Sequence, residues 1–501
     1  MSSGEKRPPP PPDSVQSRKE MKIVASPTAK AVVMIAYYFP PDGSAGVYRP
    51  LRFVRQLPTR GWQPSVVTLD TDTHQRPDPG LLKLVPPDVE IVRVRDGDLW
   101  GRIQARREDR TRAQLRNADA ATVARVRRIE QIPARRIVRR FVRALEGHVY
   151  YPDPARFWIE PAIAATVATC RSNRAAAILA TGGPWSSFVV AREASRRTGE
   201  PNVLDFRDSW TLTRNEDFEQ WRPQWATRRD RRLLPELLAA ARAIIFRYES
   251  EAESYWRAYP HALDAARVHL IPNGYEGDVK PFRAPRGDRC TVLYTGTLTS
   301  YRYDTLLDAL STLRALYPAD AARLGLTFVG EGGQDLQDDV DRRGLADMVQ
   351  TRGPVPAHEV DRLHDEAHAL LLLGVRPFRG YELGGSKVFA YLKSAKPIIG
   401  ILPNDETRNV LRAVQVPTIA GIDDPGEIVA VFRQLLCAWS QDRLGELLPD
   451  RAACASYSAG RQVDSFVRAI EGRPPQTPFI PGRVDIPDSL KSSIGRSGWI
   501  D

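Results

Sequence analysis

Two series of short apolar runs, separated by helix-length amphipathic segments, constrain the fold of this chain more than any other feature of its sequence. The runs of the first series occupy residues 31–39, 64–69, 89–94, 175–181, 201–206 and 242–246. Those of the second series occupy residues 290–296, 324–330, 369–375, 396–402 and 416–421. Strands that alternate with helices predict parallel sheets with helices on both faces. We therefore expect an α/β fold of two doubly wound, Rossmann-like domains.

The boundary between the two domains is expected in a Pro-, Gly- and Asp-rich stretch, residues 268–288, where the first series ends. We place the first domain at residues 30–275 and the second at residues 276–472. Residues 1–29 and 473–501 are rich in proline and have no apolar periodicity. That composition predicts disordered tails.

Cysteine usage and hydropathy exclude several classes of protein. The four cysteines form no CxxC pair and no cluster with histidine at the spacing of metal ligands, so neither a disulfide framework nor a structural zinc site is expected. No apolar run approaches the roughly 18 residues of a membrane-spanning helix. The first residues lack the apolar region of a secretory signal. We expect a cytoplasmic protein.

The positive charge of the chain is concentrated in one insertion, residues 101–147 of the first domain. Residues 101–143 hold 14 arginines against four acidic residues, which accounts for 10 of the net charge of +11. Residues 134–147 place apolar side chains at helical spacing with arginines on the flanks, which is typical of a helix on an anionic membrane surface. The alternative is a helix packed on the first domain with solvated arginines. Aromatic residues are scarce in residues 101–140, and no motif for nucleic-acid binding accompanies the arginines, so nucleic acid is not an expected partner.

Two segments of the first domain place candidate site residues directly after predicted strands, where open α/β sheets bind ligands. Gly43 and Gly46 allow close approach of a ligand to the backbone at the start of a helix. Asp205, Arg207 and Asp208 follow another strand, and we expect them to face the crevice. The structural alternatives are an ordinary turn for the glycines and an ion pair between Arg207 and Asp208 that holds their loop.

The most informative segment of the second domain is residues 381–400, where glycines lead into a helix. Gly384, Gly385 and Ser386 are expected at the N-terminus of that helix, with Lys387 in its first turn. A lysine there opposes the helix dipole, which favours an anion bound beside it. The helix N-terminus and the lysine together suit the charge that develops on a diphosphate leaving group.

The order and spacing of six motifs resemble those of glycosyltransferase family 4. The motifs are YYFPPDGSAG, DFRDSW, IPNGY, YTGTL, VGEGG and ELGGSKVFAYLKSAKPII. Members of that family are retaining enzymes of the GT-B fold, in which two Rossmann-like domains face each other across a cleft. The resemblance implies a site for a nucleoside diphosphate sugar mainly on the second domain and an acceptor site mainly on the first. It implies no metal and no cofactor besides the donor substrate.

The family motifs also assign roles to residues of the second domain. Glu382 matches the first glutamate of the E-x7-E signature, which contacts the donor sugar near the reacting carbon. The second glutamate, which contacts the ribose, is replaced by Ala390. Arg302 and Lys387 match the basic pair on the diphosphate.

By the same matching, the residues that line the nucleotide pocket are Gly296, Glu331 and Gly332. In the first domain, Arg207 and Asp208 are candidate catalytic residues beside Glu382. Phe188 occupies a position where many relatives have a histidine, so this possible base is missing.

The resemblance implies a hexosyltransferase that acts with retention. The basic helix expected at residues 134–147 alone suggests a lipid-linked or polysaccharide acceptor at the cytoplasmic face of the inner membrane. Two alternatives stay open. A catalytically inactive GT-B scaffold is suggested by Ala390 and Phe188, and a nucleotide-sugar epimerase of the same fold would need further carboxylates or histidines in the cleft. His148 is the histidine that we would test as a base, with packing or surface exposure as the alternative.

Overall fold

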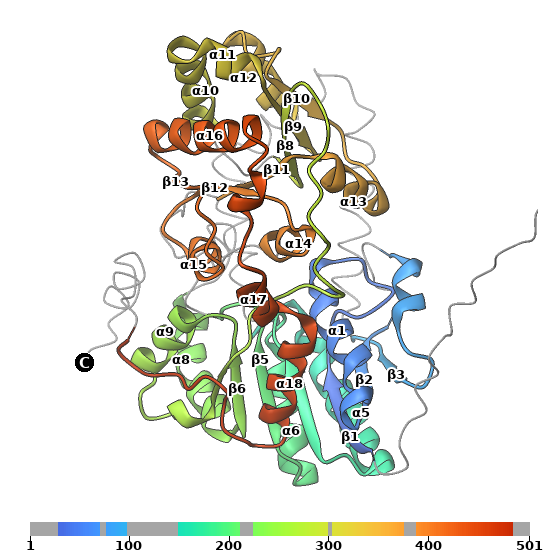
Figure 1. Cartoon of the computed structure of the whole chain (residues 1–501). Helices are drawn as coiled ribbons and strands as arrows, with labels where there is room; N and C mark the ends of the chain where they lie inside the picture. The colour runs from blue at the N-terminus through green and yellow to red at the C-terminus, as the bar shows by residue number, and fades with distance from the viewer. Residues whose placement is uncertain are drawn as a thin grey trace, which may run out of the picture.

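The computed structural model describes residues 29–70, 77–97, 149–210, 224–298, 303–374 and 387–483. These residues form two lobes, one above the other in Figure 1, with the N-terminal part of the chain in the lower lobe. Each lobe is built on one parallel sheet. The predicted α/β fold with two doubly wound domains, the GT-B architecture, is confirmed. The arginine-rich insertion and residues 1–28 and 484–501 lie outside the described residues.

The first sheet has seven strands in the order β3-β2-β1-β4-β5-β6-β7, and the strand order reverses direction at β1. Its strands are β1 (Lys30–Ile35), β2 (Trp62–Leu69), β3 (Glu90–Val94), β4 (Ala177–Thr181), β5 (Asn202–Phe206), β6 (Ala243–Phe246) and β7 (Val268–Leu270). All neighbouring strands are parallel, so their carboxyl ends meet at one edge. That edge carries the first-domain part of the site.

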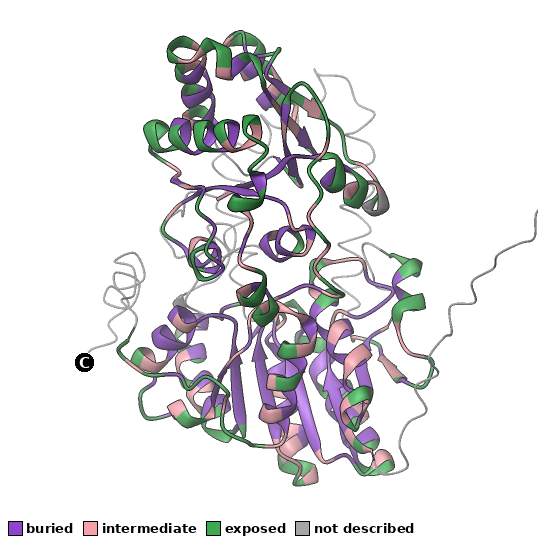
Figure 2. Cartoon of the chain, viewed as in Figure 1, coloured by how far each residue is buried: buried purple, intermediate pink, exposed green. Residues whose placement is uncertain are grey.

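Helices cover both faces of the first sheet. They include α1 (Tyr48–Gln56), α5 (Ile159–Asn173), α6 (Ser186–Thr198), α8 (Gln224–Ala240) and α9 (Glu249–Ala258). Alternation along β1 sends Val33 and Ile35 into the core under α5 and α6, and Val32 and Met34 into the core under α1. The central strands of this sheet are therefore mostly buried, as Figure 2 shows by their purple colour.

The second sheet has six parallel strands in the order β10-β9-β8-β11-β12-β13. Its strands are β8 (Cys290–Thr295), β9 (Leu324–Val329), β10 (Val349–Arg352), β11 (Ala369–Leu373), β12 (Ile398–Leu402) and β13 (Ile419–Gly421). Every predicted run contains a strand, but β10 was not predicted. It is an edge strand of sequence VQTR in which only the valine is buried, so it carries no apolar run.

The helices of the second lobe alternate with its strands. They are α10 (Asp304–Leu316), α11 (Pro318–Ala322), α12 (Gln334–Arg342), α13 (Ala357–Glu366), α14 (Lys387–Ser394), α15 (Glu406–Ala413), α16 (Pro425–Ser440) and α17 (Arg451–Cys454). In Figure 1, α14 and α15 lie on the side of this lobe that faces the other lobe, whereas α10 to α12 lie at the far end. Residues at the start of α14 and α15 are thus positioned at the junction of the lobes.

The last helix, α18 (Ala459–Ile470), returns to the first lobe and packs beside α1. Phe466 stacks on Phe53 with ring centroids 3.7 Å apart. Beyond it, Phe479 is buried in the core under α5 and α6, and the Gly482 N–H donates to Glu253. The beginning of the predicted C-terminal tail is therefore packed, because one large apolar side chain anchors it.

Among the described residues, no helix has both the length and the hydropathy needed to cross a membrane.

Candidate functional site

Lys387, the first residue of α14, lies against the end of β8. Its Nζ donates to the hydroxyl of Tyr294 at 2.7 Å and stands 4.1 Å from the centroid of that ring. Gly296, just past β8, has φ +134°, and a Cβ there would be 2.3 Å from Lys387 Nζ. Glycine at this position therefore makes room for the ammonium group. Burial lowers the pKa of Lys387 to about 8, because desolvation disfavours its charged form.

The loops that follow β8 and β9 are in direct contact beside this lysine. The Leu298 N–H donates to the Glu331 carbonyl at 2.9 Å. A Cβ on Gly330 would lie 1.9 Å from the carbonyl oxygen of Gly296, and Gly332 has φ +87°. Four of the predicted donor-site residues are thus brought together, namely Gly296, Glu331, Gly332 and Lys387.

A buried polar network connects the C-terminal half of α14 to the end of β8, and sequence reasoning missed it. His364 of α13 shares hydrogen bonds with Thr295 Oγ1 at 3.1 Å and with Ser394 Oγ at 3.2 Å. The Thr295 N–H donates to the Tyr391 hydroxyl at 3.2 Å. Burial lowers the pKa of His364 to about 4, so its ring is neutral near pH 7. The sequence gives no signal for this network, because the partners of a histidine inside an amphipathic helix cannot be recognised from the sequence.

The remaining predicted donor-site residues, Arg302, Glu382, Gly384, Gly385 and Ser386, lie outside the described residues, as does His148. Their roles stay predictions. Ala390, where the family has its second glutamate, is exposed on α14. Phe188 is fully buried and packs on Phe206 with centroids 4.7 Å apart, so this position belongs to the core.

On the first domain, Arg207 and Asp208 follow β5 and form an ion pair, Nη2 to Oδ2, of 2.9 Å. Arg207 Nη2 also donates to the Gly183 carbonyl at 2.6 Å. A Cβ on Gly46 would lie 1.9 Å from Arg207 Nη1, so Gly46 leaves space for the guanidinium. Gly43 lies in a turn in which Asp42 Oδ1 accepts from the Ser44 N–H at 2.7 Å. The ion pair that holds the loop after β5 is therefore present. Gly46 makes room for Arg207 of that loop, and Gly43 belongs to the turn before α1.

Asp205 does not face the crevice, which corrects the sequence-based expectation. Its carboxylate is fully buried in β5 and forms an ion pair with Arg49 of α1, Nη2 to Oδ1, at 2.7 Å. Arg49 Nη2 also donates to the Ile271 carbonyl at 2.9 Å. Asp205 lies within the strand, and its partner is 156 residues away in sequence. No local sequence pattern could therefore predict the pair. This pair ties α1 to β5 and to the end of β7.

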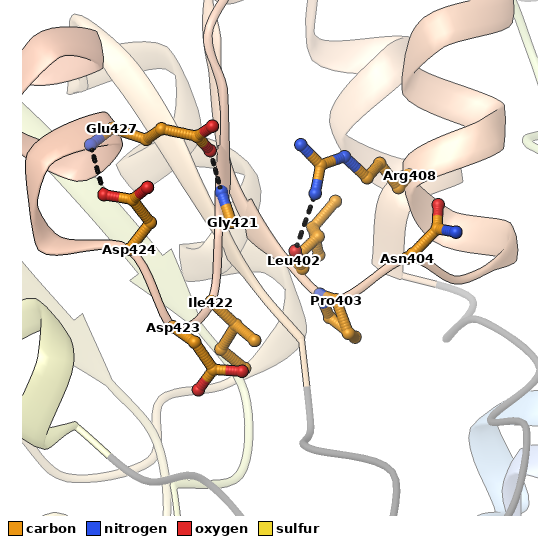
Figure 3. Close-up of a pocket in the computed structure, with 9 residues that line it drawn as sticks. All are labelled: Leu402, Pro403, Asn404, Arg408, Gly421, Ile422, Asp423, Asp424 and Glu427. Carbon is orange, nitrogen blue, oxygen red and sulfur yellow. Dashed lines mark hydrogen bonds between the residues drawn. The ribbon is translucent and has the colours of Figure 1, made fainter. Parts of the chain in front are cut away.

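A hollow of about 620 Å³ lies at the carboxyl ends of β12 and β13 (Figure 3). Its lining residues are Leu402, Pro403, Asn404, Arg408, Gly421, Ile422, Asp423, Asp424 and Glu427. Arg408 Nη1 donates to the Leu402 carbonyl at 3.3 Å, and the Gly421 N–H donates to Glu427 at 2.6 Å. Two of its three acidic side chains act locally: Asp424 caps α16, and Glu427 closes the loop. The hollow contains no predicted site residue.

The described part of the chain contains no group of three or more His, Cys, Asp or Glu side chains arranged to hold a metal ion. The chemistry of the residues that do meet is of a different kind. A desolvated lysine at the start of a helix, next to glycines that leave the backbone accessible, suits a phosphorylated ligand.

No family model matches this chain, and no curated protein sequence does. Solved structures match its fold. HepE of Anabaena, crystallised with UDP and glucose, gives a TM-score of 0.51 at 13% identity, over 88% of this chain and 99% of HepE. Sucrose-phosphate synthase of Thermosynechococcus elongatus gives 0.54 at 15% identity, over 88% and 98%. TarM gives 0.52 at 9% identity, over 88% and 98%. At such identities the likeness shows the GT-B fold, and membership of glycosyltransferase family 4 stays a prediction.

Proposed function

We propose that this protein is a retaining glycosyltransferase of family 4 type, which transfers a hexose from a nucleoside diphosphate sugar to a lipid-linked or polysaccharide acceptor. The observation that carries the proposal is Lys387. Its ammonium group is desolvated at the start of α14 and lies against Gly296, in the fold that HepE shares. HepE was crystallised with UDP and glucose, which supports a nucleotide sugar as donor.

In this proposal the start of α14 holds the diphosphate of the donor. The backbone N–H groups of the first helical turn and the Lys387 ammonium stabilise the negative charge that grows on the leaving phosphate. That stabilisation accelerates the reaction because it is stronger in the transition state than in the bound substrate. Arg302 is the proposed second cation.

The nucleotide is proposed to lie over the loops that follow β8 and β9. Gly296 and Gly332 border that surface together with Glu331, and the two glycines have no side chain, so a ribose and base can approach the backbone there. Glu382 is proposed to contact the donor sugar. The acceptor attacks from the face that the phosphate leaves, and the leaving phosphate takes the acceptor's proton.

The acceptor and the location are further parts of the proposal. The basic helix at residues 134–147 is proposed to hold the enzyme at the anionic inner face of the cytoplasmic membrane, beside a lipid-linked acceptor. An inactive scaffold is the second candidate, favoured by Ala390 in place of the second glutamate of the signature.

Thermal unfolding in the presence of UDP, GDP and ADP, each with and without an attached hexose, tests the donor site. A ligand at about 100 times its dissociation constant stabilises the native state by about 2.7 kcal/mol. We expect one nucleotide to raise the melting temperature of the wild type and of Lys393→Ala, at the other end of α14, but not of Lys387→Ala. A shift that survives in Lys387→Ala would place the site elsewhere, and no shift with any nucleotide would favour the scaffold.

A further inference from the structure

Arg247, directly after β6, is a buried guanidinium with few interactions. Its side chain is 9% exposed, and within the described residues a single carboxylate oxygen, Asp208 Oδ1, comes as near as 4.0 Å. That separation is too long for a hydrogen bond. Its Nε has no hydrogen-bond partner, and the guanidinium stands 5.6 Å from the centroid of the Tyr248 ring. Burying a guanidinium whose Nε has no hydrogen-bond partner is unfavourable, which points to a partner that binds there.

Arg207 approaches the same carboxylate from the neighbouring strand. Its side chain is 13% exposed, its Nη2 contacts Asp208 Oδ2 at 2.9 Å, and its Nε also has no partner. The two guanidinium groups therefore approach different oxygens of one carboxylate. Asp208 itself is 51% exposed, so this cluster of Arg207, Asp208 and Arg247 is reached from solvent.

The charge of this arginine cluster is positive. Asp208 compensates one of its two guanidinium groups. A further acid beside the cluster is Glu251 of α9, which is buried and accepts hydrogen bonds from Ser209 Oγ and from the Arg247 N–H. Burial raises the pKa of Glu251 to about 7, so its carboxyl is only partly ionised near neutral pH. An excess of positive charge among buried groups attracts an anion.

Gly183 leaves the space that the arginine cluster occupies. A Cβ on Gly183 would lie 2.7 Å from both Arg207 Nη2 and Asp208 Oδ2. The cluster lies at the carboxyl ends of β5 and β6, the edge at which parallel sheets bind ligands. Three residues after Arg247, Ser250 donates a hydrogen bond to Glu406 of α15. This end of β6 is therefore at the interface with the second domain, on the proposed acceptor side.

We infer that Arg207 and Arg247 bind a phosphate group carried by the acceptor. The inference rests on the proposed function, to which it adds the chemical class of the acceptor. A phosphate has enough terminal oxygens to accept hydrogen bonds from two guanidinium groups at once, and guanidinium forks match that geometry. A carboxylate, with two oxygens, can form a bidentate pair with only one of the two forks.

Calorimetric titration of inorganic phosphate into the full chain tests the inference. All variants carry Lys387→Ala, so that the donor site does not contribute. We expect Arg247→Gln to weaken phosphate binding about tenfold or more, as the loss of a charge-assisted hydrogen bond predicts, and Asp208→Asn to strengthen it. Arg171→Gln, an exposed arginine of α5 in the same domain, is the matched control and should change nothing.

Circular dichroism shows whether each variant is folded. If Arg247→Gln is unfolded, Arg247→Lys replaces it, because lysine keeps the charge but loses the fork, and intermediate binding is expected. Phosphate binding by folded Arg247→Gln and Arg207→Gln variants that equals binding by the Lys387→Ala parent, or no phosphate binding by that parent, would overturn the inference.

The source of the phosphate is distinguished by two further titrations, with polyprenyl phosphate in detergent micelles and with a soluble hexose phosphate. Binding of either one that depends on Arg247 supports the inference and names the source, whereas tighter binding of a hexuronate than of both overturns it. Nucleotide binding in the wild type separates the two proposals. If the wild type does not bind a nucleotide, the proposed function fails but the phosphate site can still be present. If the protein does not bind phosphate, the phosphate site fails but the proposed function can still be correct.

Discussion

At Lys387, two physical effects oppose the charge that the side chain carries. The residue stands at the positive end of the α14 dipole, and burial lowers its pKa to about 8. A helix designed for stability alone would place an acidic residue there. An anion bound at the same point reverses both effects, since it compensates the dipole and favours the ammonium form. The unfavourable position of this lysine therefore supports the proposed diphosphate site.

The protonation of Lys387 makes nucleotide affinity depend on pH. The free protein holds this lysine charged below pH 8 and increasingly neutral above it. A bound diphosphate favours the charged form and raises that pKa, so affinity for UDP should fall as pH rises through about 8. Calorimetric titrations below and above that pH measure the change. Lys387→Arg, which stays charged throughout, should flatten the profile, and an unchanged wild-type affinity would contradict the assignment.

Substitution of Gly296 tests the contact between this glycine and Lys387. In Gly296→Ala the new Cβ would meet Lys387 Nζ at 2.3 Å in a backbone conformation of φ +134°. We expect nucleotide binding to be lost and the native state to be destabilised by about 1–3 kcal/mol. Gly344→Ala is the control, because Gly344 also has positive φ, +65°, but has open space around it. It should lose stability without losing nucleotide affinity in a thermal shift assay.

At the scale of elements, α18 joins the end of the chain to its beginning. Phe466 stacks on Phe53 of α1, and Arg52 donates to Gln462 at 3.0 Å. The backbone of Tyr275 pairs with Ser458 just before this helix. The first domain therefore completes its core with a helix from the far end of the chain, and the two lobes are linked by two crossings of the backbone.

Removing the ring of Phe466 should destabilise the first domain. We expect Phe466→Ala to lower the free energy of unfolding by about 3–5 kcal/mol, the range for deleting a buried aromatic side chain. Urea denaturation followed by tryptophan fluorescence measures it. Ser465→Ala, a partly exposed neighbour on the same helix, should stay within about 0.5 kcal/mol of the wild type. Equal effects of the two variants would show that α18 does not pack as described.

The buried pair of Arg49 and Asp205 fixes α1 against β5. Replacing Arg49 by Leu leaves the Asp205 carboxylate buried without its counterion, which is expected to cost about 3–5 kcal/mol. Adding Asp205→Leu should recover part of that loss, because no charge is then buried. Urea denaturation of both single variants and the double variant forms the cycle. Additive losses would mean that the two side chains do not interact.

For the whole molecule, the distribution of charge separates one strongly basic segment from a nearly neutral remainder of the chain. The insertion at residues 101–147 holds 10 of the 11 net positive charges within residues 101–143. Charge confined to one segment favours binding in one orientation, since each basic residue near an anionic surface contributes about 1 kcal/mol. A membrane contact through this segment would bring the first domain, with its proposed acceptor site, to the lipid.

Neutralising the arginines of the basic helix should release the protein from anionic vesicles in a sedimentation assay. The five replaced by glutamine are Arg135, Arg136, Arg139, Arg140 and Arg143. A control variant loses the same net charge from the surface of the second domain, at Arg314, Arg342, Arg362, Arg433 and Arg443. The control should still sediment with vesicles, and nucleotide affinity should be unchanged in both. Equal release of both variants would mean that net charge alone drives binding.

The sequence by itself determined the two parallel sheets and the position of Lys387 at a helix start. Both follow from local patterns, because apolar periodicity and the glycines before a helix act within a few residues. Only the tertiary structure decided the partners of Arg49, the arginine cluster around Asp208 and the place of α18. Those contacts join residues that are far apart in sequence: 156 positions separate Arg49 from Asp205. The edge strand β10 also depended on the fold, since backbone pairing with β9 rather than apolar side chains makes it a strand.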